Sequence, residues 1–328
     1  MVPARNIYEQ QAHNRRLTWM VMLGFVLFLG FLGFGFDYYF LGLFENDLNI
    51  PLGTIIAVGV GIVMAISSLQ SGAKSVLQST GAVQADPNHP AHQQLINVVD
   101  EMSIASGMPR PQIYVIPDPD PNAFATGKDP EHSSVAVTQG LLQQLNREEL
   151  QGVIAHEMSH VRNYDIRLMT VVAAFVGAIL LLSDSARRGT RLGALSGKSS
   201  RSRSSGGAGG ILFIFWIIGM VLAPLIAQLM AMMVSRRREY LADASAAELT
   251  RNPLGLSSAL RKLEGAIEPT ASVKRGAAHL CIVDPLGRNI NSKEGFAADL
   301  FGTHPPIEKR VLALDAMAYQ YGTTTTSA

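Results

Sequence analysis

The 328-residue sequence contains a single cysteine, Cys281. One thiol excludes a disulfide framework and a cysteine-rich metal site, because each requires several cysteines. Charge is scarce as well: charged residues make up 16% of the chain, whereas about a quarter is usual in soluble proteins. The net charge of +1 argues against a nucleic acid or another polyanion as a partner bound through overall charge.

Apolar residues take the place of the missing charges. Hydrophobic residues make up 48% of the chain, the mean hydropathy is +0.19, and the excess is concentrated in four stretches. The first, Leu17 to Phe36, contains no charge, is long enough to span a bilayer and lacks the cleavage site of a signal peptide. A second stretch follows from Ile50 to Leu69. Together they predict a transmembrane hairpin over residues 17–69.

The charges around this hairpin predict its orientation. The polar segment 1–16 carries three arginines, whereas the connection between the two stretches carries Asp37, Glu45 and Asp47 and no basic residue. Basic residues favour the cytoplasmic side of a membrane. We therefore expect the N-terminus and the chain after Leu69 to face the cytoplasm.

Residues 70–167 have the mixed pattern of a soluble α/β region. A helix is predicted over His92–Ser106, a short strand over Gln112–Ile116, and two further extended pieces over Asn122–Gly127 and Ser134–Thr138. The pieces suggest a small sheet. One of its edges can hold a peptide by strand addition, but an ordinary sheet edge without a ligand fits the same pattern.

Two more apolar stretches, 168–182 and 211–234, flank a linker rich in serine, glycine and arginine at 186–210. The first stretch is short for a membrane span and the second is long enough. If both cross the membrane, the basic linker lies outside, against the usual charge rule. The sequence leaves two possibilities open: an embedded hairpin that does not fully cross, or a crossing pair that breaks the rule.

The motif His156-Glu157-Met-Ser-His160 carries the most chemistry. Histidines four residues apart share one face of a helix, so that two imidazoles can bind one zinc ion. Glu157 can then act as the general base for an attacking water. The motif is short, however, and a surface helix with two ordinary histidines also fits it.

Its surroundings predict a capped helix. Asn146 is a good N-cap, and Glu149 three residues later can complete a capping box. After the motif the chain stays helix-like, and we expect this helix to continue toward the third apolar stretch. Asp165 is expected to be a surface acid, or a partner of Arg162 or a neighbouring basic residue.

A second acidic pair, Glu239 and Asp243, also has helical spacing. A catalytic zinc usually takes three protein ligands plus water, so Glu239 is the best third ligand. Asp243 can accept a hydrogen bond from the far nitrogen of a zinc-binding histidine. The alternative is an amphipathic helix whose acids balance Arg236–Arg238. A zinc-stabilised scaffold without catalysis would need a fourth protein ligand, and only three good ones are found.

At these residues a family resemblance emerges. HEMSH, RREYLAD and the later Thr303-His304-Pro-Pro306 resemble the HtpX-type zinc membrane endopeptidases, relatives of the zinc-dependent CAAX prenyl protease within the gluzincins. The likeness covers all but the linker and the threonine-rich tail 321–328. The stretch 121–127 resembles the extended segment of the family beside the active site, which implies substrate binding by Asn122, Ala123, Phe124 and Ala125.

The resemblance also implies roles and a setting. It implies one Zn²⁺ per subunit bound by His156, His160 and Glu239, with Glu157 as base and proton shuttle. It implies that His304 stabilises the oxyanion, with Arg310 supporting the same region, although a His-Pro-Pro turn also suits the start of a helix. The implied enzyme is an ATP-independent, multi-pass endopeptidase of the cell (inner) membrane that degrades misfolded or membrane proteins. A processing protease of narrow, CAAX-like specificity would have the same site.

We therefore predict a mainly α fold with a small β-sheet, in a membrane-anchored, gluzincin-like metalloprotease with up to four transmembrane helices. Its expected order is a cytoplasmic N-terminus (1–16), a transmembrane hairpin (17–69), a catalytic region (70–167), a second hydrophobic hairpin (168–234), a region that completes the zinc site (235–320) and a flexible tail (321–328).

Overall fold

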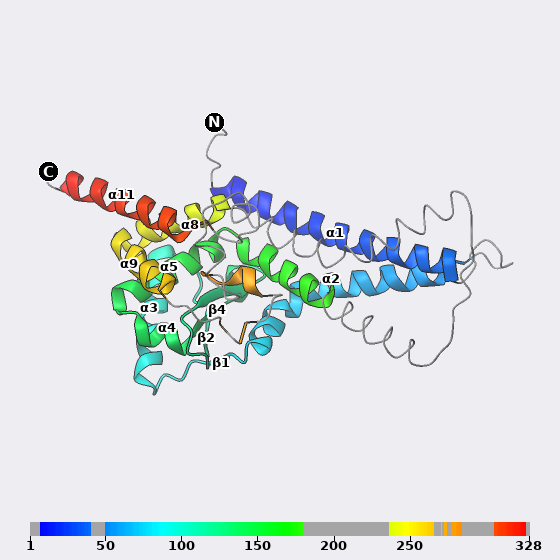
Figure 1. Cartoon of the computed structure of the whole chain (residues 1–328), viewed down its shortest axis with the longest axis horizontal. Coiled ribbons are helices and arrows are strands. Elements are labelled where there is room, and N and C mark those ends of the chain that lie inside the picture. The colour runs from blue at the N-terminus through cyan, green and yellow to red at the C-terminus, as the bar shows by residue number, and fades with distance from the viewer. Residues whose placement is uncertain are drawn as a thin grey trace.

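The computed structural model describes residues 7–40, 50–179, 236–265, 270, 272–273, 277–283 and 305–325. Two long helices lie side by side and extend away from a part that contains a small sheet and shorter helices (Figure 1). The prediction of a mainly α protein with a small sheet is confirmed. The fourth apolar stretch and the linker lie outside the described residues.

The long helices are α1, Ile7–Phe40, and α2, Leu52–Ser79. Their close approach depends on Gly33, where a Cβ would lie 2.7 Å from the carbonyl oxygen of Gly53. At the turn end, the carboxylate of Asp37 accepts hydrogen bonds from the backbone N–H groups of Gly53 and Thr54, at 2.6 and 2.7 Å. This side chain caps α2 from the neighbouring helix and closes the hairpin.

Both helices are long and apolar enough to cross a membrane. Large apolar side chains point outward from them, among them Leu27, Phe31, Ile56 and Val63. Such a surface is unfavourable in water and suits hydrocarbon. Each helix extends beyond its predicted span: α1 begins within segment 1–16, and α2 continues past Leu69, because these polar ends pack against the rest of the protein.

The sheet has four strands in the order β1-β2-β4-β3. The β2–β4 pair is parallel, whereas β1 and β3 pair antiparallel with β2 and β4. The strand bounds are Val83–Gln84 (β1), Gln112–Ile116 (β2), Ala123–Gly127 (β3) and Ser133–Thr138 (β4). The three predicted pieces are confirmed; β1 was missed because two residues show no periodicity.

Helices surround this sheet. Their bounds are Pro90–Ser106 (α3), Gln139–Gln144 (α4), Arg147–Arg162 (α5), Arg236–Thr250 (α8), Pro253–Glu264 (α9) and Ile307–Thr325 (α11), with single 3₁₀ turns at Pro130–His132 and Ala278–Leu280. Helix α5 lies in the core: Ile154 is fully buried in one cluster with residues of α3, α9 and the sheet. At Gly152 a Cβ would lie 2.7 Å from the backbone nitrogen of Leu256, so this glycine lets α5 and α9 touch.

The helix that carries the histidine motif does not continue as predicted. It ends at Arg162, Tyr164 adopts a left-handed φ of 59°, and a new helical segment covers residues 165–179. The prediction of one continuous helix is wrong, because a left-handed residue turns the chain. The new segment packs on the hairpin, where the rings of Phe175 and Phe25 stack with centroids 3.9 Å apart.

The last helix enters the segment that was expected to be a flexible tail. Helix α11 continues to Thr325, so the first part of 321–328 is helical, and residues 326–328 lie outside the described residues.

Candidate active site

The start of α5 is built as its sequence predicts. The side chain of Asn146 accepts a hydrogen bond from the backbone N–H of Glu149 at 2.9 Å, and the Glu149 carboxylate accepts one from Asn146 N–H at 2.8 Å. Lys262 of α9 adds an ion pair to Glu149 at 2.7 Å. This capping box anchors the helix that presents the histidine motif.

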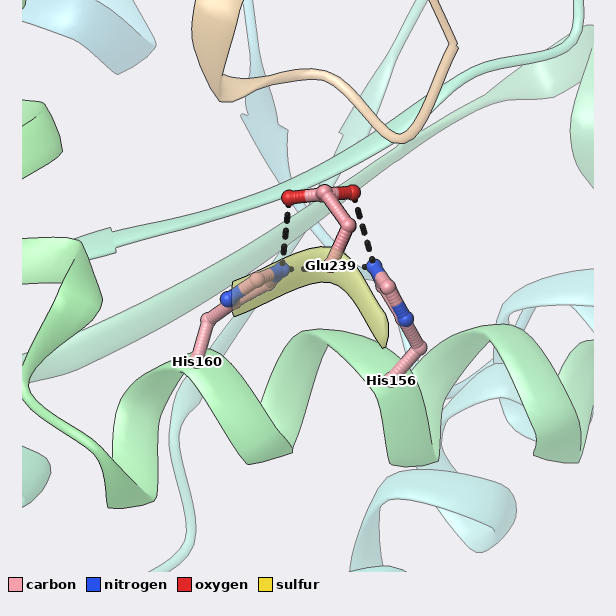
Figure 2. A group of neighbouring side chains, drawn as sticks. All are labelled: His156, His160 and Glu239. Atoms are coloured by element: carbon pink, nitrogen blue, oxygen red, sulfur yellow. Dashed lines mark hydrogen bonds and ion pairs between the residues drawn. The ribbon is translucent and has the colours of Figure 1, made fainter. Parts of the chain in front are cut away.

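Three side chains converge over the C-terminal half of α5, two of them from α5 itself and one from α8 (Figure 2). The Nε2 atoms of His156 and His160 lie 3.2 Å apart. Glu239 of α8 places one carboxylate oxygen 3.8 Å from His156 Nε2 and the other 3.6 Å from His160 Nε2. All three side chains are buried. The structure therefore brings together the three predicted metal ligands, although Glu239 lies 79 positions after His160 in the sequence.

The spacing of these atoms fits a metal ion. Two ligand atoms that each lie about 2.1 Å from a tetrahedral zinc ion are about 3.4 Å apart. The two Nε2 atoms are 3.2 Å apart, and each lies 3.6 or 3.8 Å from a different oxygen of Glu239. One ligand atom from each of the three residues lies within 4.8 Å of the others, so small side-chain adjustments bring them to the zinc spacing. Within the described ranges no fourth His, Cys, Asp or Glu joins the group. Three protein ligands with one position left for water are typical of a catalytic zinc site.

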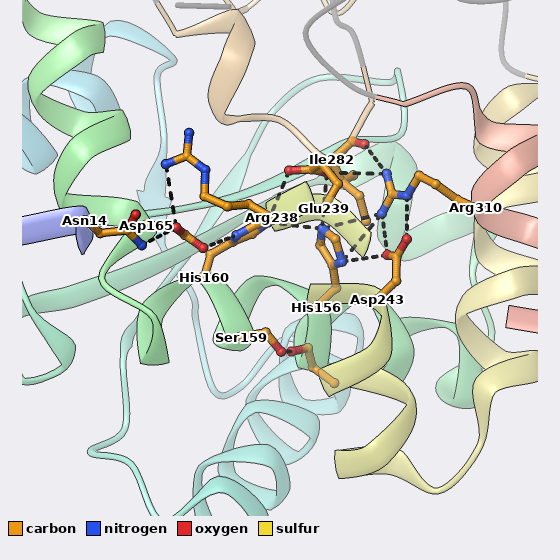
Figure 3. Close-up of polar contacts among 11 residues, drawn as sticks. Asn14, His156, Ser159, His160, Asp165, Arg238, Glu239, Asp243, Ile282 and Arg310 are labelled. Carbon is orange, nitrogen blue, oxygen red and sulfur yellow. Dashed lines mark hydrogen bonds and ion pairs between the residues drawn. The ribbon is translucent and has the colours of Figure 1, made fainter. Parts of the chain in front are cut away.

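His156 is oriented by an ion pair. Its Nδ1 lies 2.9 Å from a carboxylate oxygen of Asp243, as predicted. Arg310 of α11 donates two hydrogen bonds to the same carboxylate, at 2.7 and 2.8 Å (Figure 3). Burial by itself raises the pKa of Asp243, but the charge of Arg310 outweighs it and holds that pKa below its usual value. Burial lowers the pKa of His156, which favours the neutral imidazole that a metal requires.

His160 is oriented by a different carboxylate, that of Asp165. The His160 Nδ1 lies 3.1 Å from Asp165 Oδ2, and Asp165 is buried (Figure 3). The interpretation of Asp165 as a surface acid is therefore wrong, because the turn after α5 folds it back beneath the motif. Arg238, 3.6 Å away, is its basic partner rather than Arg162.

The surroundings of His160 favour a positive charge. Burial by itself lowers the pKa of His160, but its hydrogen bond to Asp165 and the charges of Glu239, Asp165 and Glu157 outweigh burial and raise that pKa to about 9. A point that attracts a proton so strongly also attracts a metal cation, and the two compete for the same nitrogen.

Glu157 has the properties of a general base. It directly follows His156 in the sequence of α5 and is buried. Burial raises the pKa of its carboxyl to about 7. Within the described part of the chain, its Oε1 has no hydrogen-bond partner. A carboxyl that titrates near neutral pH can accept a proton and return it, and an oxygen without a protein partner can accept one from water.

Strand β3 lies beside α5, as expected from the family's extended segment. Its outer edge is partly occupied: the Ala123 carbonyl accepts a hydrogen bond from Ile282 N–H at 2.9 Å, and Phe124 bridges to Cys281. The Asn122 side chain donates to the carbonyl of Val283 at 3.0 Å. Ala125, in contrast, directs its backbone N–H at the Glu157 carboxylate.

Of the two residues expected near the oxyanion, His304 and Arg310, the structure describes only Arg310. His304 lies outside the described residues. Arg310 is fully buried, and besides holding Asp243 it has its Nη1 3.6 Å from Glu239 and within hydrogen-bonding distance of the Ile282 carbonyl. Spacing alone cannot identify this arginine, since it follows His156 by 154 residues.

Comparison with known proteins agrees with this geometry. Residues 90–318 match the profile of peptidase family M48. The chain belongs to peptidase family M48. The match covers strands β2, β3 and β4, both histidines, Glu239 and Arg310, so the whole of this site lies within the family region.

Relatives in this family cover nearly the whole chain. The protease HtpX homolog of Thermoanaerobacter pseudethanolicus is 43% identical over 95% of this chain and 98% of its own length. That of Ligilactobacillus salivarius is 42% identical over 95% of this chain and 100% of its own. The crystal structure of S. mikatae Ste24p is similar at 20% identity with a TM-score of 0.47, covering 91% of this chain and 66% of that chain. The resemblance to HtpX-type peptidases is confirmed, and the M48 chain is a membrane metalloprotease.

Proposed function

We propose that this M48 chain is a zinc-dependent endopeptidase of the cytoplasmic membrane that hydrolyses peptide bonds in misfolded or membrane proteins. The observation that carries this proposal is the convergence of His156, His160 and Glu239 beside the buried carboxyl of Glu157. One zinc ion per subunit would be bound by the first three residues.

The residues of the chain divide the chemistry between them. When bound, zinc supplies Lewis-acid chemistry, since it polarises the scissile carbonyl and makes water more acidic. Glu157 accepts the proton of the attacking water on its carboxylate and then delivers it to the leaving amine. Asp243 and Asp165 contact the Nδ1 atoms of the two imidazoles and so leave both Nε2 atoms for the ion that His156, His160 and Glu239 would hold.

Two further residues complete the proposed site. His304 donates a hydrogen bond to the oxyanion, a role supported by the Thr-His-Pro-Pro motif that precedes α11. Arg310 supports this region from a distance, because its guanidinium is committed to Asp243 and Ile282.

Strand β3 is the proposed substrate platform. A peptide that adds to it contacts Asn122, Ala123, Phe124 and Ala125, beside Glu157. The peptide must first displace residues 281–283 from the edge of the strand, because Ile282 already bonds to Ala123. A photoreactive residue at position 124 should then crosslink to an unfolded substrate such as casein; crosslinks confined to the enzyme itself would argue against this platform.

The proposed membrane topology follows from the hairpin. The first turns of α1 contact the turn after α5, so the N-terminus and the active site lie at the same end of the two spans. The arginines of segment 1–16 favour the cytoplasm for that end. In intact cells, an impermeant thiol reagent should label a cysteine at Asn46 but not one at Glu131; the reverse pattern would invert the topology.

The decisive experiment compares wild type with Glu157→Gln in detergent, by metal analysis and casein cleavage. Glutamine keeps the shape of the side chain but cannot accept the proton, so cleavage should fall by about 10²- to 10⁴-fold while zinc remains bound. The control is Glu248→Gln, an exposed residue of α8 that should retain wild-type activity. Equal cleavage by the Glu157 variant would refute the mechanism, and wild type without zinc would refute the metal assignment.

The substrates of the wild-type enzyme test the breadth of its specificity. Cleavage of casein and of several membrane proteins fits quality control. Cleavage of a single lipidated or membrane peptide, with unfolded proteins left intact, would instead identify a dedicated processing protease with the same site.

A further inference from the structure

The first membrane helix touches the metal centre through one buried side chain, Asn14. This residue of α1 is 1% exposed. Its Nδ2 donates one hydrogen bond to Asp165 Oδ1 at 2.6 Å (Figure 3). The same nitrogen donates another to the backbone carbonyl of Asn163 at 2.8 Å. Both acceptors lack hydrogens to donate, so only the amide nitrogen can face them, and both of its N–H groups are used.

Asp165 connects this asparagine to a predicted metal ligand. One carboxylate oxygen of Asp165 accepts from Asn14, and the other lies 3.1 Å from His160 Nδ1. A carboxylate that is fixed at one oxygen has its plane set, and so directs the other oxygen at the imidazole. The carboxylate in turn fixes the tautomer and the ring orientation of a metal-binding histidine.

Neighbouring side chains of α1 hold the turn that directly precedes Asp165. Gln11 Nε2 donates to the carbonyl of Arg162 at 2.8 Å, and the guanidinium of Arg15 lies 4.9 Å from the ring centroid of Tyr164. Tyr164 is the left-handed residue of this turn, a conformation that bulky side chains adopt only when the surroundings hold them there. Helix α1 therefore clamps a strained turn directly after the metal-binding motif.

We propose that Asn14 is a positioning residue for the metal centre, through which the first membrane helix sets the orientation of His160. The inference rests on the proposed function, since it requires that His160 bind zinc. Asn14 does for His160, through Asp165, what Arg310 does for His156 through Asp243. The hairpin that anchors the enzyme would then also be part of its zinc site.

The test uses the full-length protein in detergent and measures zinc affinity by competition with a chelator. Asn14→Ala should weaken zinc binding about 10-fold, because removal of an outer-shell partner typically costs 10- to 100-fold. Asn14→Asp has the same size and should weaken it further, since a second carboxylate then faces Asp165; it also carries the test if the alanine variant does not fold. The matched control is Gln11→Ala, which loses a hydrogen bond to the same turn without touching Asp165 and should stay within about twofold of wild type.

Two readouts separate positioning from general support of the fold. The visible spectrum of the Co²⁺-substituted protein should change in Asn14→Ala and not in Gln11→Ala, because it reports the arrangement of ligands. In an Asp165→Ala background, adding Asn14→Ala should cost no further affinity, since the effect is transmitted through Asp165.

Each possible result has a distinct meaning. Equal zinc affinity in wild type and both Asn14 variants, or equal losses in Asn14→Ala and Gln11→Ala, would overturn the inference and leave the proposed function standing. Additive losses in the Asp165→Ala background would also overturn it. A wild-type protein that binds no zinc would overturn the inference together with the proposed function.

Discussion

The two histidines of the motif are held by two parts of the molecule that differ in origin. On the His156 side, Asp243 and Arg310 form a buried ion pair between α8 and α11. On the His160 side, Asp165 directly follows the turn after α5 and accepts its shortest hydrogen bond from a neutral amide on the first membrane helix. Both imidazoles have a carboxylate at Nδ1, but the two carboxylates are held by different groups: a charged guanidinium for Asp243 and a neutral amide for Asp165.

The two carboxylates, Asp243 and Asp165, differ in how their negative charge is compensated. Asp243 is balanced by a full guanidinium charge, and the His156 it holds has a lowered pKa. Asp165 is held by an amide at 2.6 Å and has Arg238 only at 3.6 Å, and the His160 it holds has a raised pKa. The lowered pKa favours the neutral form of His156, which can bind a metal directly. The raised pKa of His160 shows that its surroundings favour a positive charge.

Breaking the ion pair on the His156 side should have the largest effect on stability. Arg310→Met leaves the Asp243 carboxylate buried without its main counter-charge, and removal of one partner from a buried pair typically costs about 3–5 kcal/mol. The free energy of unfolding of the zinc-free protein measures this cost. The control is Arg261→Met, whose ion pair with Asp315 is half exposed and is worth at most about 1 kcal/mol. Equal decreases in the free energy of unfolding of both variants would show that the buried Asp243–Arg310 pair stabilises the protein no more than an exposed pair.

The two imidazoles should also differ in the protons that zinc displaces. At pH 7.5, His160 with a pKa of about 9 is protonated, whereas His156 with a lowered pKa is neutral. Zinc binding should therefore release about one proton from the histidines, and affinity should rise with pH until about pH 9. Calorimetric zinc titrations in buffers of different ionisation enthalpy count these protons.

Two variants test whether the proton released on zinc binding comes from His160. Asp165→Asn removes the main support of the charged His160 and should reduce the release, whereas Asp243→Asn should not. Without zinc, the raised pKa of His160 stabilises the fold fully below its ordinary value of 6.5, and this contribution is lost as the pH rises through about 9. A release that is insensitive to Asp165→Asn would contradict the assignment.

The smallest effect is expected for Arg15, the exposed residue of α1 whose guanidinium lies over the ring of Tyr164. Arg15→Ala removes the guanidinium that lies over Tyr164, and such an interaction contributes about 0.5–1 kcal/mol at a partly exposed site. Thermal unfolding should show this modest loss, with zinc affinity unchanged, since Arg15 does not touch Asp165. Arg16→Ala, one position along the same helix and also exposed, serves as the reference; a loss of the same size there would assign the effect to helix charge alone.

Much of the fold follows from local patterns. The capping box at Asn146, the strand Gln112–Ile116 and the two long apolar helices are encoded by neighbouring residues, and the structure has each of them. The left-handed Tyr164 has no such pattern, because nothing in its neighbours demands that conformation. It is held by Arg15 and Asn14, from a helix about 150 residues earlier in the chain.

The same limit applies to the covered edge of β3. The sequence predicts the strand as an extended piece, but its bond to Ile282 joins positions 159 residues apart. Hydrogen bonds between distant backbone groups depend on the path of the chain and not on side-chain type. The sequence therefore does not reveal that residues 281–283 occupy this edge; only the fold does.

By itself, the sequence determined the identity of the chemistry: a helix with two histidines and a glutamate, a second helix with Glu239 and Asp243, and an apolar hairpin. Helical spacing is local, so it places these groups on a common face before any tertiary contact forms. Only the tertiary structure decided that the second helix crosses the first at the right distance, that Asp165 turns inward, and that Asn14 of a membrane helix holds it. These are contacts between segments remote in sequence, and the packing of the whole chain selects them.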